Sequence, residues 1–314
     1  MKRTLAGIIL LATLQAAWAE ITPAGKVKVK KGPLFSAFAP DGQRLFISCF
    51  ATDEVCVYNT ASNKVEGRYF AGISPLGVAV TPDGSKVFVT NKRNGLVKVL
   101  DSRTFKILDD IKVGGVPSNI TLSPGGLQAF VTNYGRGKIG RVDFIDTSSH
   151  RILGNVEIGI RPLVAAVSPL GDQLFVACAG SNDIYVINVN TRRIIKQFPV
   201  GLGPNGLAFS PDGATLYVSN AGTNDLSIVD ALDLRELRRA PVGNKPFSLA
   251  VDRRGRILVV ETGDRTLSLY SPQLQRLSSV KAGKTPQHVL LSPDQRYAYV
   301  TDERKNELLI FRID

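Results

Sequence analysis

A unit of about 42 residues repeats seven times along the chain, and this repeat limits the fold more than any other feature. Each unit carries a proline near its start, at Pro33, Pro75, Pro117, Pro162, Pro204, Pro246 and Pro286. About eight residues later comes a turn such as Pro82-Asp83-Gly84, in which proline presets φ, aspartate bonds its own backbone and glycine adopts a positive φ. Short segments of alternating apolar and polar residues follow each turn, and these predict β-strands.

Four short strands per unit at this spacing predict the blade of a β-propeller. One four-stranded sheet has two apolar faces and cannot bury both alone, so the blades pack side by side around an axis. We expect an all-β, seven-bladed propeller of four-stranded antiparallel blades, forming a single domain over residues 20–314. The last unit stops at Asp314, before its fourth strand, while Lys26–Lys31 precedes Pro33 where such a strand belongs. We therefore expect the N-terminal strand to complete the last blade and close the ring.

A short β-rich tetrapeptide follows the turn in several units. Its clearest copies are Phe88-Val89-Thr90-Asn91, Phe130-Val131-Thr132-Asn133, Tyr217-Val218-Ser219-Asn220 and Tyr299-Val300-Thr301-Asp302. Together with the prolines and turns, these copies resemble the YVTN-repeat family of β-propellers, over all seven units from about residue 26 to 314. The resemblance implies the propeller fold. It says less about function, because relatives include surface-layer proteins, cofactor-carrying propellers and a periplasmic DNA-binding type.

The first nineteen residues have the pattern of a secretory signal peptide. Lys2 and Arg3 precede an apolar stretch from Thr4 to Leu14, and Ala17-Trp18-Ala19 forms a small-x-small cleavage site. The apolar stretch is about half the ~20 residues that a bilayer requires. We expect residues 1–19 to be removed, leaving a monomeric periplasmic or secreted protein without a membrane span.

Positive charge dominates the chain, with a formal net charge of +12, or 12 − 2 = +10 once Lys2 and Arg3 are removed. Such an excess favours acidic partners, although it also serves simply to keep an exported protein soluble. In a propeller, the hairpins between second and third strands share one face with the connections that carry the prolines. Basic and aromatic residues gather there, near the channel mouth. The candidate ligand-binding residues are Lys92, Arg93, Tyr134, Arg136, Lys138, Arg161, Lys245, Arg265, His288, Arg304 and Lys305.

Other residues of this face modify that expectation. Lys284 adds to the basic set, and Phe247, like Tyr134, could stack on bases or sugars. Carboxylates dilute the positive field, at Asp53, Glu54, Asp183, Asp225, Asp264 and Glu303. The alternative interpretation of the face is that loops are exposed and that lysine and arginine are common in them.

Histidine is scarce, which limits metal and acid–base chemistry. His288 follows Pro286 by two residues, and we expect its imidazole near the mouth of the central channel. It could bond a ligand, coordinate a haem-type iron, or serve as a local hydrogen-bonding residue. His150 is expected in a solvated turn on the opposite face. Two separated histidines cannot build a histidine-rich metal site, so we expect no bound metal and no cofactor.

The usual catalytic motifs are absent from the sequence. It contains no Gly-x-Ser-x-Gly elbow, no phosphate-binding glycine loop, no metalloprotease histidine pair and no Cys-x-x-Cys-His. We therefore favour a non-enzymatic binding or scaffold protein that recognises nucleic acid, an acidic glycan or an envelope protein. The alternatives are a cofactor-carrying or lactonase-like hydrolytic propeller with its site at the channel mouth, and a purely structural role in an envelope assembly.

Two of the three cysteines fall close together in the first unit. Cys49 ends the expected second strand and Cys56 lies in the third, at the positions of Asn91 and Lys98 in the second unit. We expect these positions to face each other across the hairpin. A disulfide between Cys49 and Cys56 requires a close pair and an oxidising compartment, and the alternative is two free thiols. Cys178 has no obvious partner.

Overall fold

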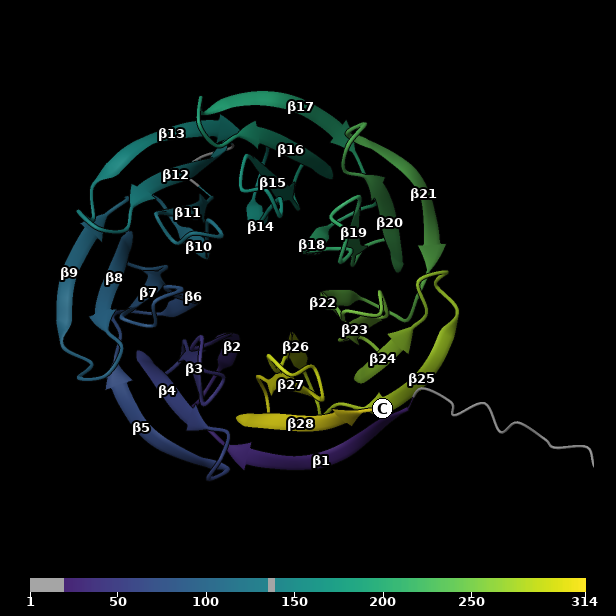
Figure 1. The fold of residues 1–314 in the computed structure, drawn as a ribbon, viewed down its shortest axis with the longest axis horizontal. Coiled ribbons are helices and arrows are strands. Elements are labelled where there is room, and N and C mark those ends of the chain that lie inside the picture. Colours follow the sequence, from purple (N-terminus) through teal and green to yellow (C-terminus); the bar gives the residue numbers. More distant parts are fainter. Residues whose placement is uncertain (1–19, 135–138) are drawn as a thin grey trace, which may run out of the picture.

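The computed structural model describes residues 20–134 and 139–314, so the predicted signal peptide lies outside the described residues. These residues form 28 β-strands in seven four-stranded antiparallel sheets, arranged as blades around a central axis (Figure 1). The prediction of an all-β, seven-bladed propeller is confirmed. In the described part of the chain, no helix has the length and apolar character needed to cross a membrane.

In the first six blades the strands run in sequence order from the axis outward (Figure 1). Blades one to three contain β2 (Pro33–Phe38), β3 (Arg44–Cys49), β4 (Glu54–Asn59) and β5 (Lys64–Phe70); β6 (Pro75–Val80), β7 (Lys86–Asn91), β8 (Leu96–Asp101) and β9 (Ile107–Lys112); and β10 (Pro117–Leu122), β11 (Gln128–Asn133), β12 (Gly140–Asp146) and β13 (Ile152–Ile158). Each blade therefore begins at one of the repeated prolines.

The remaining blades follow the same plan. Blades four to six contain β14 (Pro162–Val167), β15 (Gln173–Cys178), β16 (Asp183–Asn188) and β17 (Arg193–Pro199); β18 (Pro204–Phe209), β19 (Thr215–Asn220), β20 (Asp225–Asp230) and β21 (Arg235–Pro241); and β22 (Pro246–Val251), β23 (Ile257–Glu261), β24 (Thr266–Tyr270) and β25 (Arg276–Lys281). Blade seven contains β26 (Pro286–Leu291), β27 (Tyr297–Asp302), β28 (Glu307–Ile313) and β1 (Ile21–Lys28).

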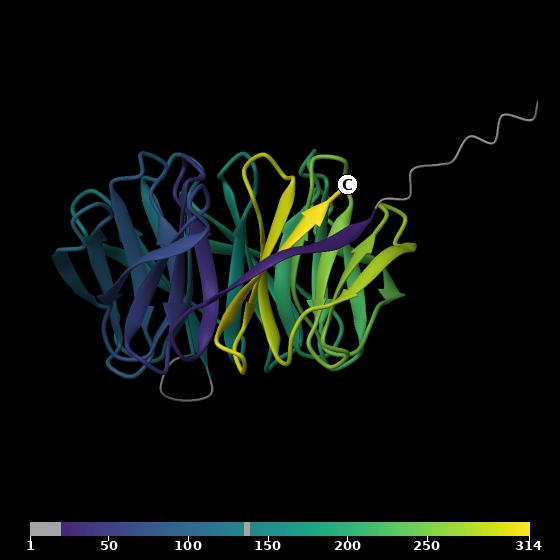
Figure 2. The same cartoon turned by 90° about the horizontal axis from the view of Figure 1, so that it is seen from below.

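The N-terminal strand closes the ring, as predicted. β1 pairs antiparallel with β28, from Ile21 opposite Ile313 to Lys28 opposite Glu307, and it crosses the outside of blade seven (Figure 2). The strand occupies Ile21–Lys28 rather than the predicted Lys26–Lys31. Its early start has a physical reason, because Ile21 is buried in the core between blades six and seven and its N–H donates to Ser278 Oγ at 3.2 Å.

The core lies between neighbouring blades rather than inside any one of them. One cluster joins Phe46 and Val57 of blade one to Val78 and Val89 of blade two, all of them buried. Middle strands such as β3 are buried on both faces, since each sheet is covered on both sides by its neighbours. Burial of apolar surface at about 25 cal/mol per Å² makes these inter-blade clusters the main stabilising contribution.

The repeated tetrapeptide has a structural explanation in its third residue. That hydroxyl donates to a carbonyl of the next blade's innermost strand, in the pairs Thr90–Ser118 (3.1 Å), Thr132–Leu163 (3.0 Å), Ser219–Phe247 (2.8 Å) and Thr301–Leu34 (2.7 Å). The last of these pairs joins blade seven to blade one. A buried hydroxyl with both roles satisfied stabilises the contact between adjacent blades. The motif is therefore explained by the fold and says nothing of a ligand.

Candidate functional site

The hairpins between second and third strands and the connections between blades form one face of the ring, called here the loop face, at the bottom of Figure 2. The Pro-Asp-Gly turns form the other face, called the turn face. The basic loop-face residues identified from the sequence are exposed wherever the structure describes them, at Lys92, Arg93, Arg161, Lys245, Arg265, Lys284, Arg304 and Lys305. Gly135–Lys138 lie outside the described residues, so the predicted site residues Arg136 and Lys138 are not placed.

These basic side chains differ from the carboxylates of the same face in what they contact. Within residues 20–134 and 139–314, none of the eight side chains forms an ion pair or hydrogen bond. Most of the carboxylates instead accept from backbone, amide or hydroxyl groups, and Glu54 pairs with Lys30 at 3.6 Å. Asp53 accepts from the N–H of Ser74 at 2.8 Å, and Glu303 accepts from Gln287 Nε2 at 2.6 Å. The bases are thus left available to an external anion.

Hydrogen bonds from the N–H groups of the loop backbone to side chains behind them, called braces here, also position the basic residues. Asp302 is fully buried, and its carboxylate accepts from the backbone N–H groups of Lys284 at 2.7 Å and Thr285 at 2.9 Å. Asn224 Oδ1 accepts from the N–H of Lys245 at 2.8 Å. Because the backbone is held from inside, each lysine side chain projects outward while its Cα stays fixed.

The structure brings only some of the predicted basic residues together. The carbonyl of Lys245 accepts from the N–H of Thr262, and that of Arg265 accepts from the N–H of Ala282, at 3.0 and 2.9 Å. These bonds join successive loops of blades six and seven into one arc, which contains Lys245, Arg265, Lys284, Arg304 and Lys305. Lys92 and Arg93 lie on blade two and Arg161 enters blade four, so these three lie elsewhere on the ring (Figure 1).

Three of the basic residues have backbones in the left-handed region. Their φ angles are 54° at Arg161, 50° at Lys245 and 60° at Arg265. At the positions equivalent to Arg265, other blades carry Gly95, Asn182, Asn224 and Asn306, which are the residue types that tolerate positive φ. A long side chain there is less favourable by about 1 kcal/mol. Turn-face loops also accept such angles at Phe105 and Leu234, so the angle alone does not mark a site.

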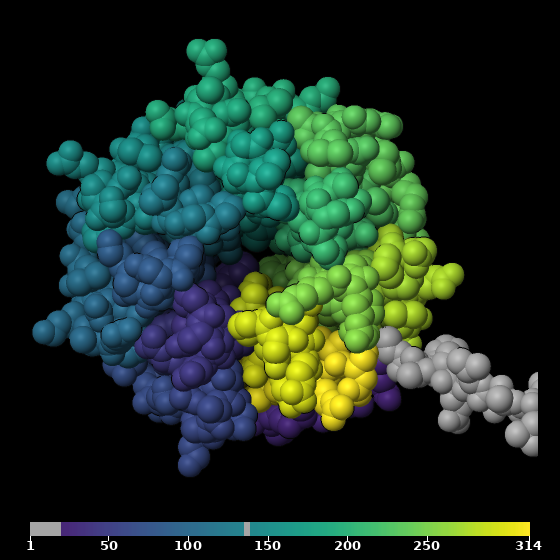
Figure 3. Space-filling view, in the orientation of Figure 1, coloured from purple at the N-terminus to yellow at the C-terminus, as the bar shows by residue number. Residues whose placement is uncertain are grey.

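A channel runs along the propeller axis, and Figure 3 shows its opening as a hollow at the centre of the ring. One cavity of about 130 Å³ is mainly apolar, and Tyr134, Phe247 and His288 are among its lining residues. Burial raises the pKa of the Tyr134 hydroxyl, and the positive charge of nearby Arg161 opposes that shift. Tyr134 and Phe247 are half-buried and line this narrow cavity.

His288 lies on β26 in the wall of this channel. It lines both the 130 Å³ cavity and a second one of about 350 Å³ that extends to Pro293, on the turn-face side. Its Nδ1 is 3.1 Å from Ser36 Oγ, and the ring packs against Phe35 with centroids 5.3 Å apart. Burial lowers the pKa of His288 to about 4, so the imidazole is neutral at neutral pH. Ser36 was not singled out by the sequence, because it lies in an ordinary strand segment of blade one.

The expectation that His150 is solvated is wrong. Its ring packs edge-on against Phe88, its Nε2 is 3.0 Å from Lys86 Nζ, and its Nδ1 is 3.1 Å from Asp109 Oδ2. A lysine can only donate, so Nε2 accepts and Nδ1–H donates to the carboxylate. His150 therefore joins blades two and three. The described residues contain no cluster of three or more His, Cys, Asp or Glu side chains that could hold a metal ion.

The cysteine pair adopts a geometry that differs from the expected one. Cys49 pairs with Glu54 and Cys56 with Ile47, so the two cysteines are diagonal neighbours and do not face each other. Both are free buried thiols with sulfur atoms 3.3 Å apart. Their hydrogen bond, together with burial, raises the pKa of Cys49, and it lowers that of Cys56. The disulfide stays a prediction. Burial raises the pKa of Cys178, which is inconsistent with a nucleophilic thiol.

Comparisons with known proteins agree on the architecture. The family model described as "SMP-30/Gluconolactonase/LRE-like region" matches residues 170–304, which is less than half of the chain. No curated protein matches the chain. Among solved structures, the chain is similar to hydrazine synthase from Kuenenia stuttgartiensis, with a TM-score of 0.82, 23% identity, and coverage of 91% of this chain and 97% of that chain. At that identity, the likeness shows the seven-bladed fold alone.

Proposed function

We propose that this chain is an exported, YVTN-type propeller that acts as a monomeric, non-enzymatic binding protein for a polyanion, either nucleic acid or an acidic glycan. The observation that carries this proposal is the unequal use of charge on the loop face. Most of its carboxylates are occupied by backbone, amide or hydroxyl donors, while eight exposed lysines and arginines have no partner among the described residues. An anion would meet donors that need not first break an internal contact.

The arc over blades six and seven is the favoured contact region. Lys245, Arg265, Lys284, Arg304 and Lys305 lie there on loops that backbone hydrogen bonds join to one another. A row of fixed positive charges suits a chain of phosphates or sulfates, whose bound counterions are released on contact. Since Tyr134 and Phe247 line the narrow channel, base stacking contributes little, and the recognition we propose is mainly electrostatic.

Fluorescence anisotropy with labelled single-stranded DNA and with a sulfated glycan tests the proposal and separates its two ligands. The key variant is Arg265→Glu with Arg304→Glu; its matched control is Arg192→Glu with Arg193→Glu, two exposed residues of the turn face and its adjoining outer strand. We expect binding that weakens steeply as salt rises, and at least a tenfold loss in the loop-face variant only. Flat titrations with both ligands, or equal losses in both variants, would overturn the proposal.

Hydrolysis in the channel is the second candidate function. The lactonase-like family match, together with the contact between His288 and Ser36, favours it. It ranks second because a base with a pKa of about 4 accepts a proton poorly at neutral pH. Opening of a simple lactone, followed by acid release in a pH-stat, should fall to background in His288→Asn if this candidate is right. Unchanged turnover in that variant would exclude His288 as the base.

A haem-type cofactor would also have to use His288, because His150 is held in its turn-face contacts. The free imidazole nitrogen, Nε2, is the atom that could bind iron, since Nδ1 contacts Ser36. Purified protein without a visible absorption band, before and after incubation with haem, would remove this alternative.

A further inference from the structure

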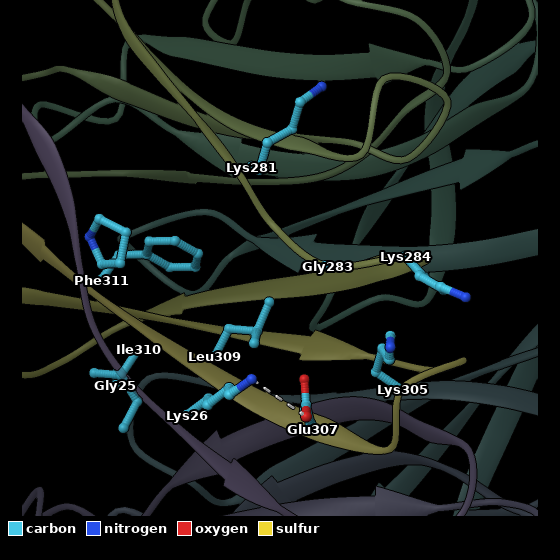
Figure 4. Close-up of a pocket in the computed structure, with 11 residues that line it drawn as sticks. Gly25, Lys26, Lys281, Gly283, Lys284, Lys305, Glu307, Leu309, Ile310 and Phe311 are labelled. Atoms are coloured by element: carbon cyan, nitrogen blue, oxygen red, sulfur yellow. Dashed lines mark ion pairs between the residues drawn. The ribbon is translucent and has the colours of Figure 1, made fainter.

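A groove separates the outer strands of blades six and seven, away from the channel. Its cavity of about 470 Å³ falls within the range typical of small-molecule sites. The groove is bounded by β25 and its following connection on one side, and by β28 and β1 on the other. Figure 4 shows Lys281 on one side and Lys26 and Glu307 on the other, with Leu309 between them.

Lysines dominate the rim of this groove. Four line it, at Lys26, Lys281, Lys284 and Lys305, against the single carboxylate of Glu307. That carboxylate is already neutralised from β1, because Glu307 Oε1 is 3.0 Å from Lys28 Nζ and 3.9 Å from Lys26 Nζ. Lys281 Nζ contacts only a carbonyl oxygen, that of Asp264 at 3.4 Å. Three of the lysines that line the groove, Lys281, Lys284 and Lys305, therefore have no carboxylate partner among the described residues.

The floor of the groove is apolar, and blade seven differs from the others in having an aliphatic residue there. Leu309 occupies the third-strand position that carries Cys56, Lys98, Asp143, Tyr185, Ser227 and Ser268 in blades one to six. Phe311 lies two residues further along the same strand, so both side chains point to the same side of the sheet. Pro23 and Gly25, at the irregularity in β1, complete the wall.

We propose that this groove binds an anionic amphiphile, a molecule with a carboxylate, sulfonate or phosphate head and a short apolar chain. The head group lies among Lys281, Lys284 and Lys305, and the chain lies over Leu309 and Phe311. The lysine half alone would also suit a polyanion, but a polyanion would gain nothing from the apolar floor. A neutral hydrocarbon would gain nothing from the lysines. The two halves together select a ligand that carries both properties.

Isothermal titration of the mature protein with decanoate, below its micelle concentration, tests the site, with decyltrimethylammonium as the cationic ligand of equal chain length. One variant is Lys281→Glu with Lys284→Glu, and the other is Leu309→Ser, which copies Ser227 and Ser268. The control is Lys196→Glu, an exposed residue on the outer strand of blade four. We expect decanoate affinity to fall at least tenfold in the lysine variant and severalfold in Leu309→Ser, with the control unchanged.

Equal binding of both detergents, or decanoate affinity unaltered by the lysine reversals, would overturn the proposal. A melting curve would reveal whether Leu309→Ser lowers stability. In that case the lysine variant still tests the site. This site shares Lys284 and Lys305 with the loop-face arc, so the apolar floor is what separates it from the proposed polyanion function. Leu309→Ser leaves every loop-face charge in place, so it should weaken decanoate binding while anisotropy with DNA or glycan stays the same.

Discussion

The buried carboxylate of Asp302 holds the backbone N–H of Lys284 at 2.7 Å, so an acid inside blade seven fixes the place of a base on its surface. The same carboxylate accepts from the N–H groups of Thr285 at 2.9 Å and Lys305 at 3.3 Å. Equivalent braces recur, since Glu261 accepts from the N–H of Gly243 and Asn133 from that of Val116, both at 2.8 Å. The loop face is therefore a braced backbone that carries exposed basic side chains.

Replacing the brace should affect both stability and binding. Asp302→Ala leaves buried N–H groups without acceptors, and we expect the free energy of unfolding to fall by about 2–3 kcal/mol. Polyanion affinity should fall as well, because Lys284 is no longer held. Urea unfolding and anisotropy measure the two effects. Lys284→Ala is the matched variant, with weaker binding at unchanged stability; a stable Asp302→Ala protein would contradict the bracing role.

Arg265 should favour polyanion binding while lowering the stability of the fold. Its φ of 60° suits asparagine better than arginine, so Arg265→Asn should raise the free energy of unfolding by about 0.5–1 kcal/mol. The same change should weaken polyanion binding. Arg192, at φ 55° on the turn face, offers a control of equal charge and similar backbone. Arg192→Asn should give the same stabilisation without any loss of affinity, and equal losses from both variants would show that only net charge matters.

The half-buried imidazole of His288 in the channel wall should make stability depend on pH. Its pKa is about 4 in the folded chain and near 6.5 in the unfolded chain, so unfolding takes up a proton at intermediate pH. The contribution of the neutral imidazole to the free energy of unfolding is complete above pH 6.5 and is lost as the pH falls towards 4. Because the imidazole lines the channel, solvent reduces the effect. We expect the free energy of unfolding to fall by about 1–2 kcal/mol between pH 7 and pH 5.

His288→Asn copies the Asn119 of blade three and should abolish that part of the pH dependence. Urea midpoints at pH 7 and pH 5 for both proteins give the difference. The low pKa values of Asp83 and Asp146, each near 2, do not interfere, since those carboxyls stay ionised in this range. Parallel pH profiles for the two proteins would contradict the assignment.

The sequence predicts the fold well because each constraint is local and repeated. Prolines, turns and alternating strands recur seven times, and the missing last strand identifies β1 as its replacement. Side-chain contacts are harder to predict, since they join units far apart in sequence. Ser36 and His288 are 252 residues apart, yet they meet because blades one and seven are neighbours in the closed ring. His150 illustrates the same limit, as its partners lie in blade two.

Register was the other source of error. The sequence places Cys49 and Cys56 on facing positions, but the hairpin pairs Cys49 with Glu54. The tight hairpin moves the partner by two residues and makes the cysteines diagonal neighbours, as are Asn133 and Asp143, whose Nδ2 and Oδ2 atoms are 2.9 Å apart. The groove that has Leu309 in its floor is likewise recognised only when the third-strand positions of the blades are compared in the folded structure.

Thiol titration of the purified protein should show whether the diagonal cysteines are joined. Sulfur atoms 3.3 Å apart can approach bonding distance with a small movement, and an oxidising compartment favours the bond. We expect one reactive thiol, that of Cys178, after unfolding without reductant, and three after reduction. Cys49→Ser should then leave two thiols with or without reductant. Three thiols in the unreduced wild-type protein would exclude the bridge.

Ring closure by β1 should dominate the stability of the whole propeller. Removing residues 20–31 deletes the Ile21 contact with blade six and the pairing with β28, and leaves that strand as an open edge. We expect the melting temperature to fall by on the order of 10 °C, with aggregation that appears in gel filtration as a higher-mass peak. Lys26→Ala is the control, since it loses only an exposed ion pair worth about 0–1 kcal/mol. An unchanged melting temperature in the shortened protein would mean that blade seven is stable with three strands.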